Sequence, residues 1–359
     1  MNTFATFDKN KKMRYFILLI GVFLCTSCSL NTETDYRSVH IERVFTDSLS
    51  IRAIVPIDAS RVWFASNQGK VGLIDKTVPK LATIKYEDSL LHFRSIAVTK
   101  EAVFVLSISN PGVLYKIIVS GSEASSIEEV YVENGEKVFY DSMAFFNDME
   151  GIAMGDPTSS CLSIITTRDG GNNWEKLDCE RLPIVEKGEA AFAASNSNIA
   201  IYKDNVWVVS GGKKARVFHS IDKGVTWNVF DTPILQGKAM TGIYSVDFFD
   251  EQTGVIIGGN WDDKEFNQGN KAITIDGGKT WSLLSNGKGP GYRSSVKFVP
   301  GSNGQGIVAV GSPGISYSAD QGKHWIELSS EGFYALEFVN DSIAFASGRN
   351  KISKLIFKK

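Results

Sequence analysis

Short apolar runs bounded by turn residues recur along the chain and predict β-strands. Seven four-residue runs contain mostly β-branched, aromatic and other apolar side chains, whereas no long stretch shows the helical period. Each is interpreted as the second strand of a repeating antiparallel unit. These runs are Val62–Ala65, Val103–Leu106, Gly151–Met154, Val206–Val209, Val255–Gly258, Ile307–Val310 and Ile343–Ala346.

Four turns share the sequence Ser/Thr-x-Asp-x-Gly-x-x-Trp. The carboxylate can accept backbone N–H bonds inside the turn, the glycine supplies a positive φ, and the tryptophan covers the hairpin. Repeats of about 40 to 55 residues that hold several short strands are typical of a β-propeller with one repeat per blade. We therefore expect a structural role for these turns. Their aspartates are Asp169, Asp222, Asp276 and Asp320.

The number of strand runs favours seven blades, although six or eight remain alternatives. The last repeat, residues 333–357, has room for only three strands, and residues 39–45 form an additional strand before the first blade. The simplest arrangement makes that strand the outer strand of the last blade, which leaves no edge unpaired. The sequence thus predicts an all-β, seven-bladed β-propeller over residues 39–359, closed by its N-terminal strand.

The start of the chain has the features of an export signal. A basic segment precedes the apolar stretch Tyr15–Leu24, which is too short to span a bilayer but is typical of a signal peptide. Cys28 follows small residues as in a bacterial lipobox, with ordinary secretory cleavage as the alternative. We expect a lipoprotein signal peptide over residues 1–27 and a flexible tether over residues 28–38.

The expected location is therefore the cell envelope, on the periplasmic face or the outer-membrane surface. The membrane would be reached only through the lipid on Cys28. Met1 and Met13 are both possible starts of translation.

Composition excludes several functions. The 359 residues carry 38 basic and 40 acidic side chains, a net charge of −2 that gives no electrostatic case for nucleic acid. With four histidines and no cluster at ligand spacing, we predict no metal, and no glycine-rich cofactor motif precedes a helix. Cys161 and Cys179 flank the first aspartate turn, which favours a cross-strand disulfide in an oxidising compartment over two separate buried thiols.

The candidate site comes from aligning the starts of the seven predicted inner strands. These starts share one face of a propeller, which we call the mouth, and arginine there suits capture of a carboxylate or phosphate. The hypothesis is a mouth that binds an anion or acidic peptide; the alternative is a wet channel whose Arg–Asp pairs satisfy one another. The residues are Arg52, Arg94, Asp141, Glu189 beside Ala190, Tyr244, Arg293 and Tyr334.

The longest loop expected on the same face, residues 260–270, carries Trp261 and Phe266 among charged residues. Exposed aromatic side chains suit contact with a protein partner or a sugar. The alternative is a solvated insertion whose aromatic side chains cover the blade below.

The turn motif resembles the Asp-box (BNR) repeat of sialidases and related propellers. Over residues 39–359 the chain is similar to the photosystem II stability/assembly-factor-like propellers. That resemblance implies an exported, seven-bladed protein that binds other proteins during assembly without catalysis. We also expect the ring to be monomeric. Arginines on the propeller face are also a feature of that family, which Arg52, Arg94 and Arg293 match. We accordingly expect a non-catalytic protein-binding module without a cofactor.

Two alternatives remain. A sialidase-like glycoside hydrolase would use three arginines, a Tyr–Glu pair and an aspartate, and this chain has candidates for all of these roles. Sialidases, however, have six blades and an F/Y-R-I-P motif near the start, whereas the nearest fragment here is Glu180–Pro183. The other alternative is a glycan-binding surface lipoprotein that uses Trp261. The hydrolase candidates are Arg52, Arg94, Arg293, Tyr334, Glu189 and Asp141.

Overall fold

The computed structural model describes residues 1, 3, 35–120 and 123–359. The chain divides into two compact units, Met1–Glu33 and Thr34–Lys359. Apart from Met1 and Thr3, the predicted signal peptide lies outside the described residues, as do Cys28 and the first part of the tether. Within the described part, no helix is long and apolar enough to cross a membrane.

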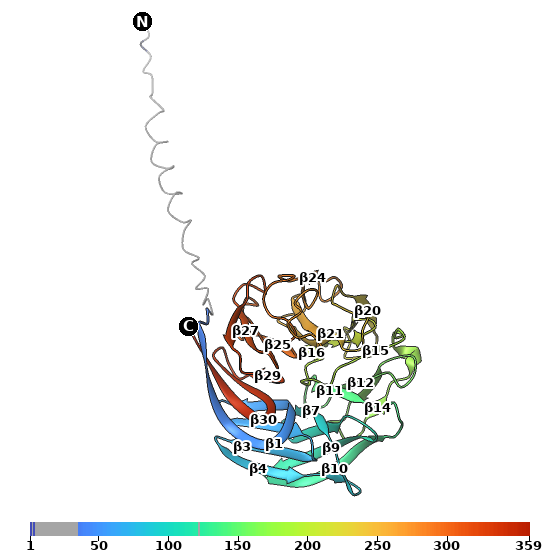
Figure 1. The fold of residues 1–359 in the computed structure, drawn as a ribbon. Helices are drawn as coiled ribbons and strands as arrows, with labels where there is room; N and C mark the ends of the chain where they lie inside the picture. Colours follow the sequence, from blue (N-terminus) through green and yellow to red (C-terminus); the bar gives the residue numbers. More distant parts are fainter. Residues whose placement is uncertain (2, 4–34, 121–122) are drawn as a thin grey trace. The chain divides into compact units, whose positions relative to one another are not determined.

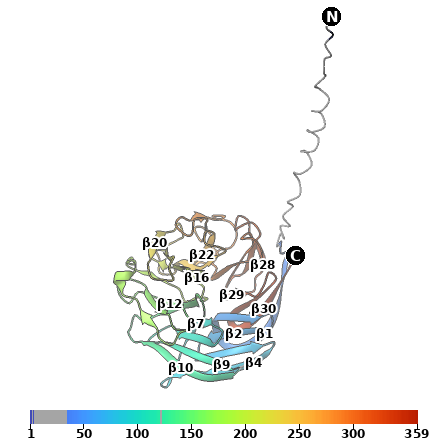
Figure 2. The same cartoon turned by 180° about the vertical axis from the view of Figure 1, so that it is seen from behind.

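The second unit consists of antiparallel β-sheets arranged around a centre (Figures 1 and 2). One six-stranded sheet has the order β29 (Ala335–Phe338), β30 (Ile343–Lys358), β1 (Ser38–Asp58), β2 (Arg61–Ser66), β3 (Lys70–Asp75), β4 (Val78–Thr83). The other has the order β15 (Glu189–Ala190), β18 (Gly211–Gly212), β21 (Thr241–Phe248), β22 (Gly254–Asn260), β23 (Lys271–Thr274), β24 (Ser282–Leu283).

Four sheets have four strands each. Their orders are β10 (Glu123–Glu133), β9 (Gly112–Ser120), β8 (Ala102–Ser107), β7 (Phe93–Val98); β11 (Tyr140–Phe145), β12 (Gly151–Gly155), β13 (Ser163–Thr167), β14 (Glu175–Lys176); β16 (Ile199–Tyr202), β17 (Asn205–Val209), β19 (Arg216–Ser220), β20 (Asn228–Asp231); and β25 (Ser295–Phe298), β26 (Ile307–Gly311), β27 (Gly314–Ser318), β28 (Ile326–Ser329). A small hairpin pairs β5 (Lys85–Tyr86) with β6 (Ser89–Leu90), and η1 (Cys179–Arg181) is a single 3₁₀ turn.

The innermost strands contact one another in a closed cycle. In order they are β1, β7, β11, β16, β21, β25 and β29, and β29 contacts β1 again. Apolar side chains fill the spaces between neighbouring sheets. For example, Ala65 and Val71 of one sheet belong to the same buried cluster as Val103 and Val105 of the next. The all-β propeller is thus confirmed.

The prediction of seven separate blades is wrong in its number. Among the described residues there are six sheets of four or more strands, because the first and last predicted blades are joined in one sheet. The joining strand is β1, which pairs with β30 from Ser38 to Ser50 and with β2 from Ile51 to Asp58. All seven apolar runs identified from the sequence nevertheless lie in strands.

The N-terminal strand closes the ring, since Val39 pairs with Phe357 and Phe45 with Ile352 (Figure 1). The folded ring begins earlier than residue 39, which was its predicted first residue. Tyr36 is already part of the fold, because it is only 1% exposed and its ring lies 4.9 Å from that of Phe357. The start of the second unit is thus held by an aromatic contact as well as by strand pairing.

The four aspartate turns share one set of hydrogen bonds. In the turn at Asp276, the Thr274 hydroxyl donates to Oδ1 of the carboxylate (2.8 Å) and accepts a bond from the Gly278 N–H (2.9 Å). The carboxylate also accepts bonds from the N–H (2.9 Å) and hydroxyl (2.6 Å) of Thr280. The glycine has a φ of +88°, which favours a residue without a side chain. Equivalent hydroxyl–carboxylate bonds occur at Asp169, Asp222 and Asp320.

Candidate functional site

Four of the aligned residues occupy equivalent irregular positions on inner strands. In β1, Ile51 pairs with Ser66 and Ala53 with Ala65, so that Arg52 falls between paired residues. The same register shift occurs in β7, β11 and β21, where the intervening residues are Arg94, Asp141 and Tyr244. A bulge of this kind re-aims a side chain away from the regular alternation of a strand.

Two arginines and an aromatic ring come together. The Arg52 guanidinium lies over the Tyr334 ring, 4.0 Å from its centroid, and its Nη1 donates to the Ala194 carbonyl (3.1 Å). Arg94 donates from Nη1 to the Ala193 carbonyl (3.2 Å) and from Nε to Nε2 of His92 (3.2 Å). Both arginines are half-buried. Within the residues described, neither forms an ion pair with a carboxylate.

The electrostatics of this cluster reflect crowding of positive charge. Burial and then the charge of Arg52 lower the pKa of Arg94 to about 10, against the opposing effect of Asp141. Burial, reinforced by Arg94 and Arg52, lowers the pKa of His92 to about 4. His92 is therefore neutral at pH 7 and accepts the hydrogen bond from Arg94.

The carbonyls that accept these arginine bonds belong to the stretch of chain that follows β15 and precedes β16 in sequence. This stretch contacts the inner strands at the centre of the ring. We call residues 192–197 the central segment. Phe192 stacks on Tyr244 with centroids 3.9 Å apart, and Asn196 donates to the Ile96 carbonyl and accepts from the Met143 N–H, both at 3.0 Å.

Two serines of the central segment complete its attachment. Ser195 donates to the Ser294 carbonyl (2.6 Å), and Ser197 donates to the Ser245 hydroxyl (2.7 Å). Together with the arginine bonds, these contacts tie one short segment to the inner strands of several sheets. The centre of the predicted mouth is thus occupied by the central segment.

Asp141 is a buried carboxylate near Arg94. It is fully buried, and neither carboxylate oxygen has a hydrogen-bond partner in the described part of the chain. Burial, and then the neighbouring Asp156, raise the pKa of Asp141 well above its ordinary value, while Arg94 opposes the shift. Asp156 accepts a bond from the Ala191 N–H (2.7 Å), and burial raises its pKa to about 6.

The alignment was wrong at Glu189. This residue lies in β15, which pairs with β18, and the inner strand of that repeat is β16. The Glu189 side chain is completely buried and forms an ion pair with Arg216 (2.5 Å). Its carboxylate supports the fold below the central segment and is not available to a ligand.

The structure also does not bring Arg293 to the other two arginines. Its Nη1 donates to the carbonyl of the adjacent Tyr292 and its Nη2 to the Ser316 hydroxyl, both at 2.9 Å, and it lines a separate cavity. Tyr244 is buried, its hydroxyl donates to the Met240 carbonyl, and its ring supports the central segment by stacking on Phe192. The predicted convergence is thus reduced to Arg52, Arg94, Tyr334 and the buried Asp141.

The loop expected to contact a partner leaves both of its aromatic side chains exposed. Trp261 and Phe266 are 44% and 36% exposed on the loop between β22 and β23, and Lys264 lies over the Trp261 ring at 4.7 Å. Elsewhere, Cys161 and Cys179 are joined by a disulfide. No group of three or more His, Cys, Asp or Glu residues that could hold a metal occurs in the described regions.

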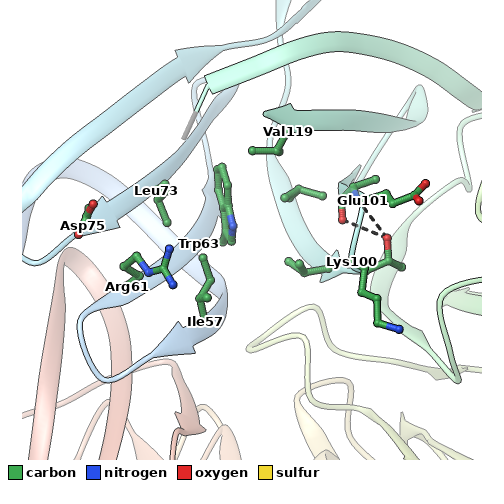
Figure 3. A pocket seen from close by; sticks show the side chains of 12 residues that line it. Ile57, Arg61, Trp63, Leu73, Asp75, Lys100, Glu101 and Val119 are labelled. Carbon is green, nitrogen blue, oxygen red and sulfur yellow. Dashed lines mark hydrogen bonds between the residues drawn. The ribbon is translucent and has the colours of Figure 1, made fainter. Parts of the chain in front are cut away.

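A second hollow, of about 500 Å³, lies between the sheets of β2 and β8. Figure 3 shows the Trp63 side chain standing between Leu73 and Ile57 on one side and Val119 on the other. Its charged rim is already paired in part, because Arg61 binds Asp58 (2.7 Å) and Lys100 binds Asp148 (3.0 Å). These pairs leave no concentrated charge of one sign at this hollow.

Sequence reasoning missed His92 and the central segment. The available indication was the run of small and polar residues from Ala193 to Asn198, which is too polar for an inner strand. Its position at the start of a predicted blade could have marked it as an irregular segment. Its contacts with β1, β7, β11, β21 and Ser294 could not be predicted, because they depend on ring closure.

No protein-family model matches the chain, and no curated protein matches it. Solved structures do. "YCF48 bound to D1 peptide" has a TM-score of 0.64 at 14% identity, covering 90% of this chain and 98% of that one. The RRP9 WD40 repeats have a TM-score of 0.60 at 12% identity, covering 89% and 98%.

A third similar structure is the GH74 xyloglucanase from Xanthomonas campestris. Its TM-score is 0.61 at 13% identity, covering 88% of this chain but only 53% of that one. At these identities the likenesses establish the propeller fold. Chemistry must be argued from the residues of this chain.

Proposed function

We propose that this protein is a non-catalytic binding module whose ring centre captures a carboxylate of an acidic peptide segment. The observation that carries the proposal is the pair Arg52 and Arg94. Both guanidiniums are half-buried, and their partners are two carbonyls, a neutral imidazole and a tyrosine ring. Nε of Arg52 is buried without a hydrogen-bond partner in the described structure.

A carboxylate is a better partner for such a pair than the present carbonyls. Hydrogen bonds between two ionised groups are shorter and roughly twice as strong as neutral ones, and a guanidinium fork can hold both carboxylate oxygens. A ligand carboxylate would replace the Ala193 and Ala194 carbonyls and neutralise the crowded positive charge. An extended acidic segment would also be able to reach Trp261 and Phe266 if it ran across the same face.

The comparison with YCF48 supports a peptide as the ligand, since that similar propeller is bound to the D1 peptide. The hydrolase alternative loses its key residues. Glu189 is engaged with Arg216, Asp141 is buried, and Arg293 lies in another cavity. A binding function needs none of these groups to be exposed.

The test is a fluorescence-anisotropy titration of the full chain with acidic peptides and with matched peptides in which Asp and Glu are replaced by Asn and Gln. We expect acidic peptides to bind at least about tenfold more tightly, with affinity falling as salt rises. The double variant Arg52→Gln, Arg94→Gln should lose this preference. The control is Arg61→Gln, which removes an exposed arginine that is paired with Asp58.

Two results would contradict the proposal. Equal binding of acidic and neutral peptides would show that the arginine pair does not select a carboxylate. An equal loss in the Arg61 control would show that net charge matters and the ring centre does not. Melting curves of each variant distinguish lost binding from lost folding.

We further propose that the chain is exported and carries a lipid on Cys28. The support is the basic segment, the apolar stretch and the small residues before that cysteine. Cells expressing the full chain and given labelled palmitate should label the protein, and Cys28→Ala should abolish the label. Labelling that persists in this variant would place the lipid elsewhere.

A further inference from the structure

A cavity of about 320 Å³ lies beside β27 and the start of β28, away from the ring-centre arginines. It is closed on the other side by the loop that follows β22 and by the connection from β24 to β25. Its lining brings together a buried cation, two acidic side chains and flat apolar walls. Six of the lining residues are Glu265, Arg293, Pro313, Ser316, Trp325 and Glu327.

Arg293 is the buried cation. The residue is 3% exposed, and its guanidinium donates to the Tyr292 carbonyl and the Ser316 hydroxyl, both at 2.9 Å. These bonds use two of the five N–H donors of an arginine, and Nε has no partner in the described structure. Gly311 leaves room for the chain of this arginine, since a Cβ there would lie 3.1 Å from Cδ of Arg293.

A second buried cation lies nearby. Lys271 is 1% exposed and donates from Nζ to the Asn270 side chain (2.9 Å) and the Pro290 carbonyl (3.3 Å). Burial, and then the charge of Arg293, lower the pKa of Lys271 to about 8. Two buried positive charges thus influence each other, and Arg293 is the one that lines the cavity.

Negative charge lies on the outer side. Glu265 and Glu327 are exposed and line the same cavity. Both raise the pKa of Arg293, although burial is the stronger influence and lowers it to about 10. Within the described regions neither glutamate forms an ion pair with Arg293. Arg293 and the two glutamates therefore line one cavity without an ion pair between them.

We propose that this cavity binds a small zwitterion of the amino-acid class. Its carboxylate would bind the free donors of Arg293, and its ammonium group would lie between Glu265 and Glu327. Trp325 and Pro313 would pack against the carbon chain. A ligand with both charges can pair with the arginine and with the glutamates. A simple anion is repelled by the glutamates, and a simple amine is repelled by the arginine.

The experiment is calorimetric titration of the full chain with glycine, β-alanine, 4-aminobutyrate, 6-aminohexanoate and L-lysine. Acetate and butylamine are the single-charge references. The series varies the distance between the two charges. We expect at least one zwitterion to bind about tenfold or more tightly than both references, which is the scale of one added charge-assisted contact.

The double variant Glu265→Gln, Glu327→Gln should bring the affinity of the best zwitterion down to that of acetate. Both glutamates are exposed, so the variant should fold. Glu101→Gln is the matched control, because Glu101 is an exposed glutamate at the other hollow. The proposal is overturned if no zwitterion exceeds the better reference, if the double variant binds it unchanged, or if the control loses binding equally.

Discussion

Replacing Glu189 by alanine should destabilise the propeller by about 3–5 kcal/mol, the cost of removing one partner of a buried ion pair. Its carboxylate accepts bonds from Nε (3.0 Å) and Nη2 (2.5 Å) of Arg216 and from the Ser210 hydroxyl (2.5 Å). The alanine variant leaves the Arg216 guanidinium, whose side chain is 10% exposed, with the Ile184 carbonyl as its remaining partner (2.9 Å).

Two further variants test whether the cost comes from the stranded charge. Glu189→Gln keeps acceptor and shape but loses the negative charge, so its cost should lie below that of alanine. Replacing both partners, Glu189→Leu with Arg216→Met, removes both buried charges and should be much less destabilising than Glu189→Ala, because apolar pairs of similar volume often substitute well.

Urea denaturation followed by tryptophan fluorescence and circular dichroism measures the free energy of unfolding of each variant. The reasoning is refuted if Glu189→Ala costs less than about 1 kcal/mol, since a buried guanidinium without its partner must cost more than that. It is also refuted if the double variant Glu189→Leu, Arg216→Met loses as much unfolding free energy as Glu189→Leu and Arg216→Met lose in sum when each is made alone. The two side chains would then be uncoupled.

Three other perturbations have directions fixed by the structure. Tyr36→Ala should lower stability by about 3–5 kcal/mol in the same denaturation assay, since it empties an aromatic site at the closure of the ring. Burial raises the pKa of Asp156 to about 6, above that of the unfolded chain, so the free energy of unfolding should fall as pH rises from about 4 to about 6. Asp156→Asn should flatten this fall, measured as the unfolding midpoint against pH. Burial raises the pKa of Asp276, but the hydrogen bonds from Thr280, Thr274 and the Lys279 N–H together outweigh it and lower the pKa, so Asp276→Ala should cost about 1–2 kcal/mol at pH 7. That deficit should shrink as pH falls below about 4, and a deficit independent of pH would contradict the assignment.

The sequence predicted the fold well wherever local chemistry decides it. The four aspartate turns and the seven apolar runs each depend on residues within one hairpin, and all appear as hairpins or strands. The sheet count was wrong because β1 continues from one pairing into the next, and apolar patterning does not show where a long strand changes its partner.

The candidate site was predicted only in part. Arg52 and Arg94 were found because their strands begin with the same pattern and carry the same bulge. Arg293 also follows a large apolar or aromatic residue and precedes a small one, but its guanidinium is held by Ser316. Glu189 was misaligned because Glu-Ala-Ala resembles the start of a strand, whereas the polar central segment that follows is what enters the ring. Side-chain direction at a strand start depends on register and neighbours, which sequence periodicity does not contain.

The pairing of residues 37–39 with the C-terminal strand has a consequence for protein engineering. The Arg37 N–H donates to the Lys358 carbonyl (2.8 Å), so the first and last strand residues lie next to each other. A circular permutant that links residue 359 to residue 35 through a few glycines, and opens the chain in the exposed β3–β4 turn at Lys76–Thr77, should therefore fold to the same ring. Reporter domains fused to residue 35 of a truncated chain and to residue 359 would leave from neighbouring points of the ring, which would allow the ring centre to be studied with both positions occupied.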